Sequence, residues 1–209
     1  MNDLERKEEL DQIRDKVLVC TKCRLSETRT NAVPGKGNYS TEIMFVGEAP
    51  GANEDKEGVP FCGASGHFLD TMLESIGLNR ESVFITNTVK CRPPDNRDPE
   101  DDEKMACRPY LDSQIKLINP ALIVCLGRHA TSSLLPGMPS ISHLHGKVLK
   151  RPNGVVYLPL YHPAAALHNG SLRSTLVSDF QKIPAILNKI KETSCKEETK
   201  ENITQETLI

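Results

Sequence analysis

The chain has 209 residues, a formal net charge of −2 and a hydrophobic fraction of 38%. This length suits one folded domain that buries a substantial core. Its apolar runs are far shorter than the ~20 residues of a transmembrane helix, so we expect no membrane association. The N-terminal segment is charged throughout, unlike a signal peptide, and a cytoplasmic protein is expected.

The apolar pattern alternates between helices and strands along the chain. An amphipathic helix is predicted first, at residues 3–18, and the remaining helices at 66–76, 99–118, 128–135 and 171–190, with an interruption of the last near Pro184. Strands are predicted at 42–46, 82–86, 121–126 and 155–160. Alternation of this kind indicates a parallel sheet with helices on both faces. We therefore predict an α/β fold of three layers, α/β/α, around a four-stranded, mainly parallel sheet.

The domain organisation and the charge pattern follow from composition. One domain is expected over residues 1–190, and residues 191–209 lack apolar periodicity and are expected to be a disordered polar tail. Residues 34–126 carry 9 basic and 15 acidic side chains, whereas residues 127–190 carry 7 basic and 1 acidic. One end of the molecule should therefore be electropositive, as suits a polyanion such as nucleic acid.

Four segments leave the carboxyl ends of the predicted strands, where ligands bind in parallel sheets. These segments are GEAPGANED at 47–55, NTVKCRPP at 87–94, GRHA at 127–130 and YHPAAAL at 161–167. Each is rich in Gly, Pro or polar groups, so we predict a binding site at this edge. The first segment lacks the Gly-Lys-Ser/Thr ending of a P-loop, which argues against a nucleoside triphosphate.

Several side chains in and near these segments carry suitable chemistry. The amide of Asn87 offers a donor and an acceptor to a base edge. His162 can donate to a developing anion, and Phe61 can stack on a planar ligand. Carboxylates are supplied by Glu48, Glu54 and Asp55 on the first loop.

The cysteine pattern favours a metal centre over disulfide bonds. The chain has seven cysteines, an odd number, and no export signal is expected. Cys20 and Cys23 are separated by two residues, and Cys91 and Cys107 by 15. Four thiolates could hold either tetrahedral zinc or a [4Fe–4S] cluster, and the spacing alone leaves both open.

Seven collinear motifs between residues 17 and 190 resemble the family 4 uracil-DNA glycosylases. They are VCTKCRLSETRTNAVPGKG, FVGEAPGANED, GVPFCGASGHFLDTML, ITNTVKCRPPDNRDP, ACRPYL, LGRHA and LPLYHPAAAL. The resemblance implies a uracil-DNA glycosylase-like fold. It also implies a [4Fe–4S] cluster on Cys20, Cys23, Cys91 and Cys107.

The resemblance further implies a base-excision repair reaction. Uracil is flipped out of DNA, and its N-glycosidic bond is hydrolysed to leave an abasic site. Asn87 would bind the uracil edge and His162 would stabilise the leaving anion. Phe61 would stack on the ring, and Glu48, Ala49 and Pro50 would line the pocket.

The remaining expectations concern water, DNA and assembly. Ala49 stands where better-known relatives carry a water-activating aspartate, so Glu48 and Glu54 are the candidates for that role. Leu167 resembles the residue that wedges into the gap left by the flipped base. We expect a monomer in the prokaryotic cytosol or nucleoid that acts on uracil in double- or single-stranded DNA.

Two other functions remain open at this point. A non-catalytic nucleic-acid-binding module, stapled by a four-cysteine metal site, would share the basic region but give Asn87 and His162 no task. A metal-dependent nuclease would use Glu48, Glu54 and Asp55 together.

Overall fold

The computed structural model describes residues 2–151 and 154–193. Within them a six-stranded sheet has the order β1-β3-β2-β4-β6-β5. Its strands are β1 (Lys36–Gly37), β2 (Ile43–Gly47), β3 (Phe84–Asn87), β4 (Leu122–Leu126), β5 (Leu149–Lys150) and β6 (Val156–Leu160). The middle four pair in parallel, which confirms the predicted sheet. The antiparallel edge strands β1 and β5 were not predicted, because two residues are too few to show an alternating pattern.

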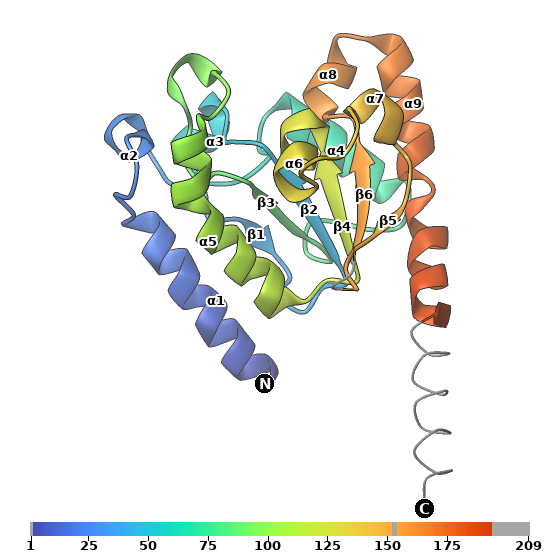
Figure 1. Ribbon diagram of the computed structural model, residues 1–209, viewed down its shortest axis with the longest axis horizontal. Coiled ribbons are helices and arrows are strands. Elements are labelled where there is room, and N and C mark those ends of the chain that lie inside the picture. The colour runs from blue at the N-terminus through green and yellow to red at the C-terminus, as the bar shows by residue number, and fades with distance from the viewer. Residues whose placement is uncertain (1, 152–153, 194–209) are drawn as a thin grey trace, which may run out of the picture.

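The helices connect the strands in the expected order (Figure 1). They are α1 (Asp3–Leu18), α2 (Leu25–Thr28), α3 (Ala52–Glu57), α4 (Ala64–Glu74), α5 (Asp101–Ile118), α6 (Gly127–Leu134), α7 (Ile141–Leu144), α8 (Pro163–Leu167) and α9 (Gly170–Phe180), with a 3₁₀ turn η1 (Pro94–Asn96) before α5. No helix in the described part of the chain is long and apolar enough to cross a membrane.

The predicted interruption of the last helix is confirmed. After α9 the chain makes a turn at residues 181–182 and is helical again over 183–193. Pro184 lies in the first turn of this second segment, where a missing N–H costs nothing. Residues 191–193 therefore continue a helix, and the rest of the predicted tail, 194–209, lies outside the described residues.

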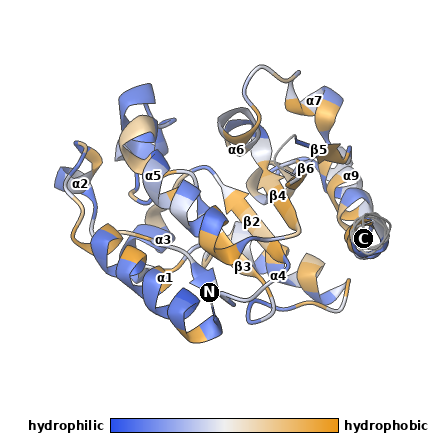
Figure 2. Ribbon diagram, turned by 60° about the horizontal axis from the view of Figure 1, so that its bottom comes forward, coloured by the Kyte–Doolittle hydropathy of each residue, from blue (hydrophilic) through white to orange (hydrophobic). Residues whose placement is uncertain are grey.

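Alternate strand residues point to opposite faces of the sheet and form two cores. One face carries Met44, Val46, Phe84, Ile123, Cys125 and Tyr157, which pack with α1, α5 and α6. The other carries Ile43, Phe45, Ile85, Leu122, Val124 and Leu158, which pack with α4 and α9. Figure 2 shows this apolar sheet between helices whose outer faces are hydrophilic. The predicted three layers are thus observed.

A buried carboxylate fixes the start of α5. The side chain of Glu103 has no exposed surface and accepts two hydrogen bonds from Arg97, at 2.6 and 2.8 Å. It also accepts from Arg24 Nε at 3.1 Å and from the N–H of Glu100 at 2.7 Å. The bonds from Arg97 hold the pKa of Glu103 at about 2, against the opposing effect of burial. This cluster ties the segment after Cys23 to the loop that follows Cys91.

We expect Glu103→Gln to lower the stability of the protein by about 1–3 kcal/mol at pH 7, because it weakens charge-assisted hydrogen bonds. The folded pKa lies below the unfolded value of about 4.3, so this stabilisation is present above pH ~4.3 and is lost as the pH falls toward 2. Thermal denaturation of both proteins between pH 3 and 7 measures the difference, which should shrink below pH ~4.3. Asp112→Asn, at an exposed ion pair, is the control and should change little.

Candidate active site

The parallel register gathers the predicted segments at one edge of the sheet. Gly47 at the end of β2 pairs with Asn87 at the end of β3, and Leu126 of β4 pairs with Leu160 of β6. The loops and short helices α3, α6 and α8 that follow these strands lie at the same end of the molecule (Figure 1). A pocket there can draw side chains from four separate parts of the sequence.

The amide of Asn87 is buried against a glycine. Asn87 is 1% exposed, and its Nδ2 has no hydrogen-bond partner within the described part of the chain. A Cβ on Gly47 would lie 2.3 Å from Asn87 Oδ1 and 2.8 Å from the ring of Phe61. Gly47 therefore lets the amide and the ring approach the same backbone. A buried donor without a partner is costly, so this amide is suited to a ligand that supplies an acceptor.

Phe61 is held in a left-handed backbone conformation, with φ of 52°. Its N–H donates to Glu54 Oε1, and its carbonyl accepts from Arg80 Nη2. Gly66 packs so closely that a Cβ there would lie 1.6 Å from the carbonyl oxygen of Phe61. Contacts on both sides of the residue thus offset the strain of this conformation and fix the ring in place.

The carboxylates of Glu54 and Asp55 accept hydrogen bonds from backbone N–H groups, an arrangement that differs from the water-activating role expected of Glu54. The two oxygens of Glu54 accept from the N–H groups of Phe61 and Gly51, and burial raises the pKa of Glu54 while these bonds oppose it. Asp55 is buried and accepts from the N–H of Thr30 at 2.9 and 3.1 Å. These two carboxylates bind backbone groups and do not form a shared cation site with Glu48, as the nuclease alternative requires.

His162 is the N-cap residue of α8. Its Nδ1 accepts from the N–H of Ala164 at 3.1 Å, so the proton of the neutral ring is on Nε2. The rings of His162 and Phe61 stack, with centroids 5.5 Å apart. Burial, with a smaller effect of His129, lowers the pKa of His162 to about 4. Near neutral pH this residue is therefore an uncharged N–H donor beside Phe61.

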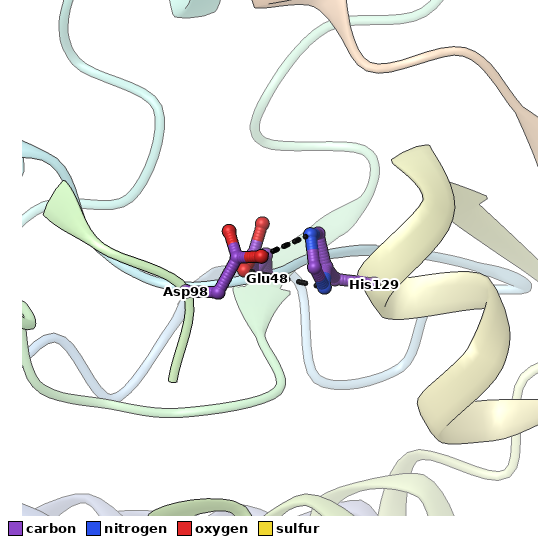
Figure 3. A group of neighbouring side chains, drawn as sticks. All are labelled: Glu48, Asp98 and His129. Carbon is purple, nitrogen blue, oxygen red and sulfur yellow. Dashed lines mark ion pairs between the residues drawn. The ribbon is translucent and has the colours of Figure 1, made fainter. Parts of the chain in front are cut away.

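Glu48 lies in a cluster with two residues that the sequence analysis did not select, Asp98 and His129 (Figure 3). Glu48 Oε1 is buried and has no hydrogen bond to any described residue, and its nearest ion-pairing atom is Nδ1 of His129 at 3.6 Å. His129 Nε2 lies 3.2 Å from Asp98 Oδ2. Burial and then the charge of Asp98 raise the pKa of Glu48 to about 7. Glu48 is therefore poised to exchange a proton near neutral pH.

The other predicted pocket residues have simpler positions. Ala49 is half-buried against the core, and Pro50 is buried. Leu167 ends α8 and is half-buried, next to the exposed Ala164 and Ala165.

The four selected cysteines line one small cavity. Cys20 and Cys23 come from the turn between α1 and α2, Cys91 from the segment after β3, and Cys107 from α5. Arg29 Nη1 donates to Cys91 Sγ at 2.9 Å, and burial raises the pKa of Cys107 to about 11. A thiolate this deeply buried needs a compensating positive charge, which a metal centre supplies. The donor set fits a four-thiolate centre.

The other described cysteines lie apart from this cavity. Cys62 is half-buried in the loop after Phe61, and Cys125 is buried within β4.

Lys90 connects the cysteine cavity to the pocket. Its backbone N–H donates to Cys107 Sγ at 3.2 Å. Its buried ammonium donates to the carbonyl of Asn87 at 2.8 Å, to Gln114 Oε1 at 2.8 Å and to the hydroxyl of Thr86. The backbone at Asn87 is thereby bonded to the same residue that contacts a cysteine of the cavity.

A site that combines an aromatic ring, a buried amide and a neutral imidazole donor, within a chain that carries a basic segment, is typical of enzymes that bind a base extruded from nucleic acid. The sequence model of the Uracil DNA glycosylase superfamily matches residues 34–187. A type-4 uracil-DNA glycosylase of Sulfurisphaera tokodaii is 55% identical over 182 residues, 83% of this chain and 83% of the relative.

Two further relatives agree. Type-4 uracil-DNA glycosylases of Archaeoglobus fulgidus and Thermotoga maritima are 47% and 42% identical, over 87% and 88% of this chain and 95% and 97% of their own lengths. The chain belongs to the uracil-DNA glycosylase superfamily and, within it, to the type-4 enzymes. It is a DNA repair glycosylase, so the prediction from the seven motifs is confirmed.

We expect Gly47→Ala to lower the rate of uracil excision about 100-fold or more, because the new Cβ displaces Asn87 and Phe61. Single-turnover assays on a uracil-containing oligonucleotide measure this rate. Gly170→Ala is the control, because a Cβ there meets no atom within 4 Å. A Gly47→Ala enzyme with the normal rate would show that these two side chains do not form the uracil pocket.

Proposed function

We propose that this glycosylase selects uracil with Asn87, stabilises the departing uracil anion with His162, and directs the attacking water with Glu48. The observation that carries the proposal is the buried Nδ2 of Asn87, which has no hydrogen-bond partner among the described residues and lies near the stacked rings of Phe61 and His162. These groups lie together at the carboxyl edge of the sheet.

Selection of uracil follows from the donors and acceptors of an amide. Uracil presents an acceptor at O4 and a donor at N3, and one amide satisfies both with Nδ2–H and Oδ1. Cytosine presents a donor and an acceptor at the same positions, so an amide in this orientation rejects it. The close contact of Asn87 with Gly47 supports a fixed orientation. Phe61 offers its face to the flipped ring.

The chemical step separates charge. Cleavage of the N-glycosidic bond leaves the sugar cation-like and uracil anion-like. His162, as a neutral Nε2–H donor, hydrogen-bonds uracil O2 and strengthens this bond as negative charge develops there. A pKa of about 4 supports the uncharged form throughout the neutral range.

Water must then reach the sugar carbon and lose a proton. Glu48 is the better-placed carboxylate, because its Oε1 is not engaged by any described hydrogen-bond donor. Glu54 instead uses both oxygens on backbone N–H groups, which supports a role in positioning Phe61. Ala49 contributes only backbone and a small side chain to the pocket wall.

The DNA reaches this edge from the side of α8. Leu167 fills the gap left by the flipped base, and exposed basic residues such as Lys147 and Arg173 meet phosphates. We propose that the enzyme acts as a monomer. Its proposed substrate is uracil in double- or single-stranded DNA. Because this DNA lies in the prokaryotic cytosol, we propose that the enzyme acts there.

Cys20, Cys23, Cys91 and Cys107 hold a [4Fe–4S] cluster, as the resemblance to family 4 implies, and the shared cavity supports this assignment. The cluster is structural. It would join the turn between α1 and α2, the helix α5 and the segment after β3, and the reaction requires no electron transfer.

The reaction is tested by incubating a uracil-containing oligonucleotide with enzyme in EDTA, with and without subsequent alkali. A glycosylase works in EDTA and yields strand breaks only after alkali, whereas a metal-dependent nuclease cuts without alkali and only when Mg²⁺ is supplied in place of EDTA. We expect His162→Ala to reduce the single-turnover rate about 10²–10³-fold with little loss of DNA affinity.

Asn87→Asp should depress uracil excision, because an ionised carboxylate repels O4, and should favour some cytosine excision. Normal uracil excision by both variants would refute these assignments.

The cluster assignment predicts a brown protein that absorbs at about 400 nm and contains about four irons per chain. Cys91→Ala should lose both colour and iron. Cys62→Ala is the matched control and should keep them, because Cys62 lies outside the cysteine cavity. A colourless protein with one zinc per chain would overturn the iron–sulfur assignment.

A further inference from the structure

His129 lies in the first turn of α6, directly after the carboxyl end of β4, and none of the roles assigned above uses it. Its two ring nitrogens are each near a carboxylate from a different part of the chain, Nδ1 near Glu48 after β2 and Nε2 near Asp98 before α5 (Figure 3). The ring also acts electrostatically on His162. His129 thus lies beside the proposed water-directing residue and influences the pKa of the proposed leaving-group residue.

We propose that His129 is a positioning residue for catalysis, which holds Glu48 Oε1 with its Nδ1–H and thereby leaves Oε2 for the attacking water. The inference rests on the proposed role of Glu48.

The tautomer of His129 supports this direction of donation. Arg128 Nε donates to His129 Nε2 at 2.7 Å, a shorter contact than that of the same nitrogen with Asp98 Oδ2 at 3.2 Å. Asp98 Oδ2 accepts from Arg128 Nη2 at 3.3 Å, so we assign Nε2 as an acceptor and place the proton of the neutral ring on Nδ1. Nδ1 is the atom that faces Glu48 Oε1, at 3.6 Å. This separation is longer than a hydrogen bond, and catalytic contacts of this kind commonly tighten when substrate binds. The buried Oε1 of Glu48 has no hydrogen-bond donor among the described residues.

The charged residues near Glu48 change its pKa in opposite directions, according to the sign of their charge. Asp98 raises the pKa of Glu48, whereas Arg128 from α6 and Lys104 from α5 lower it. Arg128 Nη2 also contacts Asp98 Oδ2 at 3.3 Å, so the same arginine bonds the histidine and the second carboxylate. An N–H from His129 stabilises the charged form of Glu48 and acts in the same direction as the two cations.

The pKa of Glu48 can be measured from the acid limb of the pH–rate profile, which is the part where the rate falls as the pH is lowered. A carboxylate that directs water must be ionised, so the rate falls as the pH drops below its pKa. An apolar side chain at 129 keeps the site dry but removes the donor, which raises the pKa of Glu48 and moves the limb to higher pH. Removal of the Asp98 charge lowers that pKa and moves the limb to lower pH.

The experiment measures single-turnover uracil excision between pH 4.5 and 9 for a set of variants of the full chain. We expect His129→Leu, and likewise His129→Met, to shift the acid limb up by about one pH unit. His129→Gln retains an N–H donor and should stay within about 0.3 unit of the parent enzyme. Asp98→Asn should shift the limb in the opposite direction. His143→Leu, at an exposed histidine of α7, is the matched control and should not move it.

The outcomes separate the two proposals. If Glu48→Gln leaves the acid limb in place, the proposed role of Glu48 fails and the inference fails with it. If Glu48→Gln removes the limb but the apolar variants at 129 leave its midpoint unchanged, the role of His129 alone is overturned. Equal shifts for His129→Leu and His129→Gln would also overturn it, because a merely space-filling residue would give that result.

Discussion

The parallel register of β2, β3, β4 and β6 is the constraint on which the rest of the molecule depends. Because side chains alternate along each strand, the four strands can be buried on both faces only if helices cover both sides, and each helix returns the chain to the same starting edge. Every strand therefore ends at the opposite edge, and the residues that follow are brought together. Glu48, Asn87, His129 and His162 all follow or end a strand of this sheet.

Convergence of the backbone does not by itself make a pocket of defined shape. That shape depends on close approaches that only small residues allow, at Gly47 beside Asn87 and at Gly66 beside Phe61. Glu54 and Arg80 then bind opposite sides of the peptide backbone at Phe61 and hold its left-handed conformation. The surrounding contacts offset the cost of this strained backbone conformation, as is common at sites where a rigid surface binds a ligand.

Structural elements and site residues could be predicted from the sequence where they lie in short contiguous motifs or in periodic apolar patterns. The strands, the positions of Asn87 and His162, and the four cysteines could be read from periodicity and from contiguous motifs. The segment 127–130 was expected at this edge, but the pairing of His129 and Asp98 with Glu48 could not be predicted, because it depends on the packing of α5 and α6 against the sheet. The surroundings of Glu54 were equally hidden, since its partners are backbone N–H groups that no side-chain pattern records. Edge strands of two residues leave no periodic signal.

Lys90 gives the cysteine site a consequence for discrimination between bases. Its ammonium gives three hydrogen bonds in a dry interior, one of them to the carbonyl of Asn87, while its own N–H contacts the sulfur of Cys107. The amide that we propose to distinguish uracil from cytosine is therefore part of a backbone segment that Lys90 links to the sulfur of Cys107. On the proposed roles, damage to the cysteine site would therefore loosen the backbone that orients Asn87 and would weaken discrimination between the two bases.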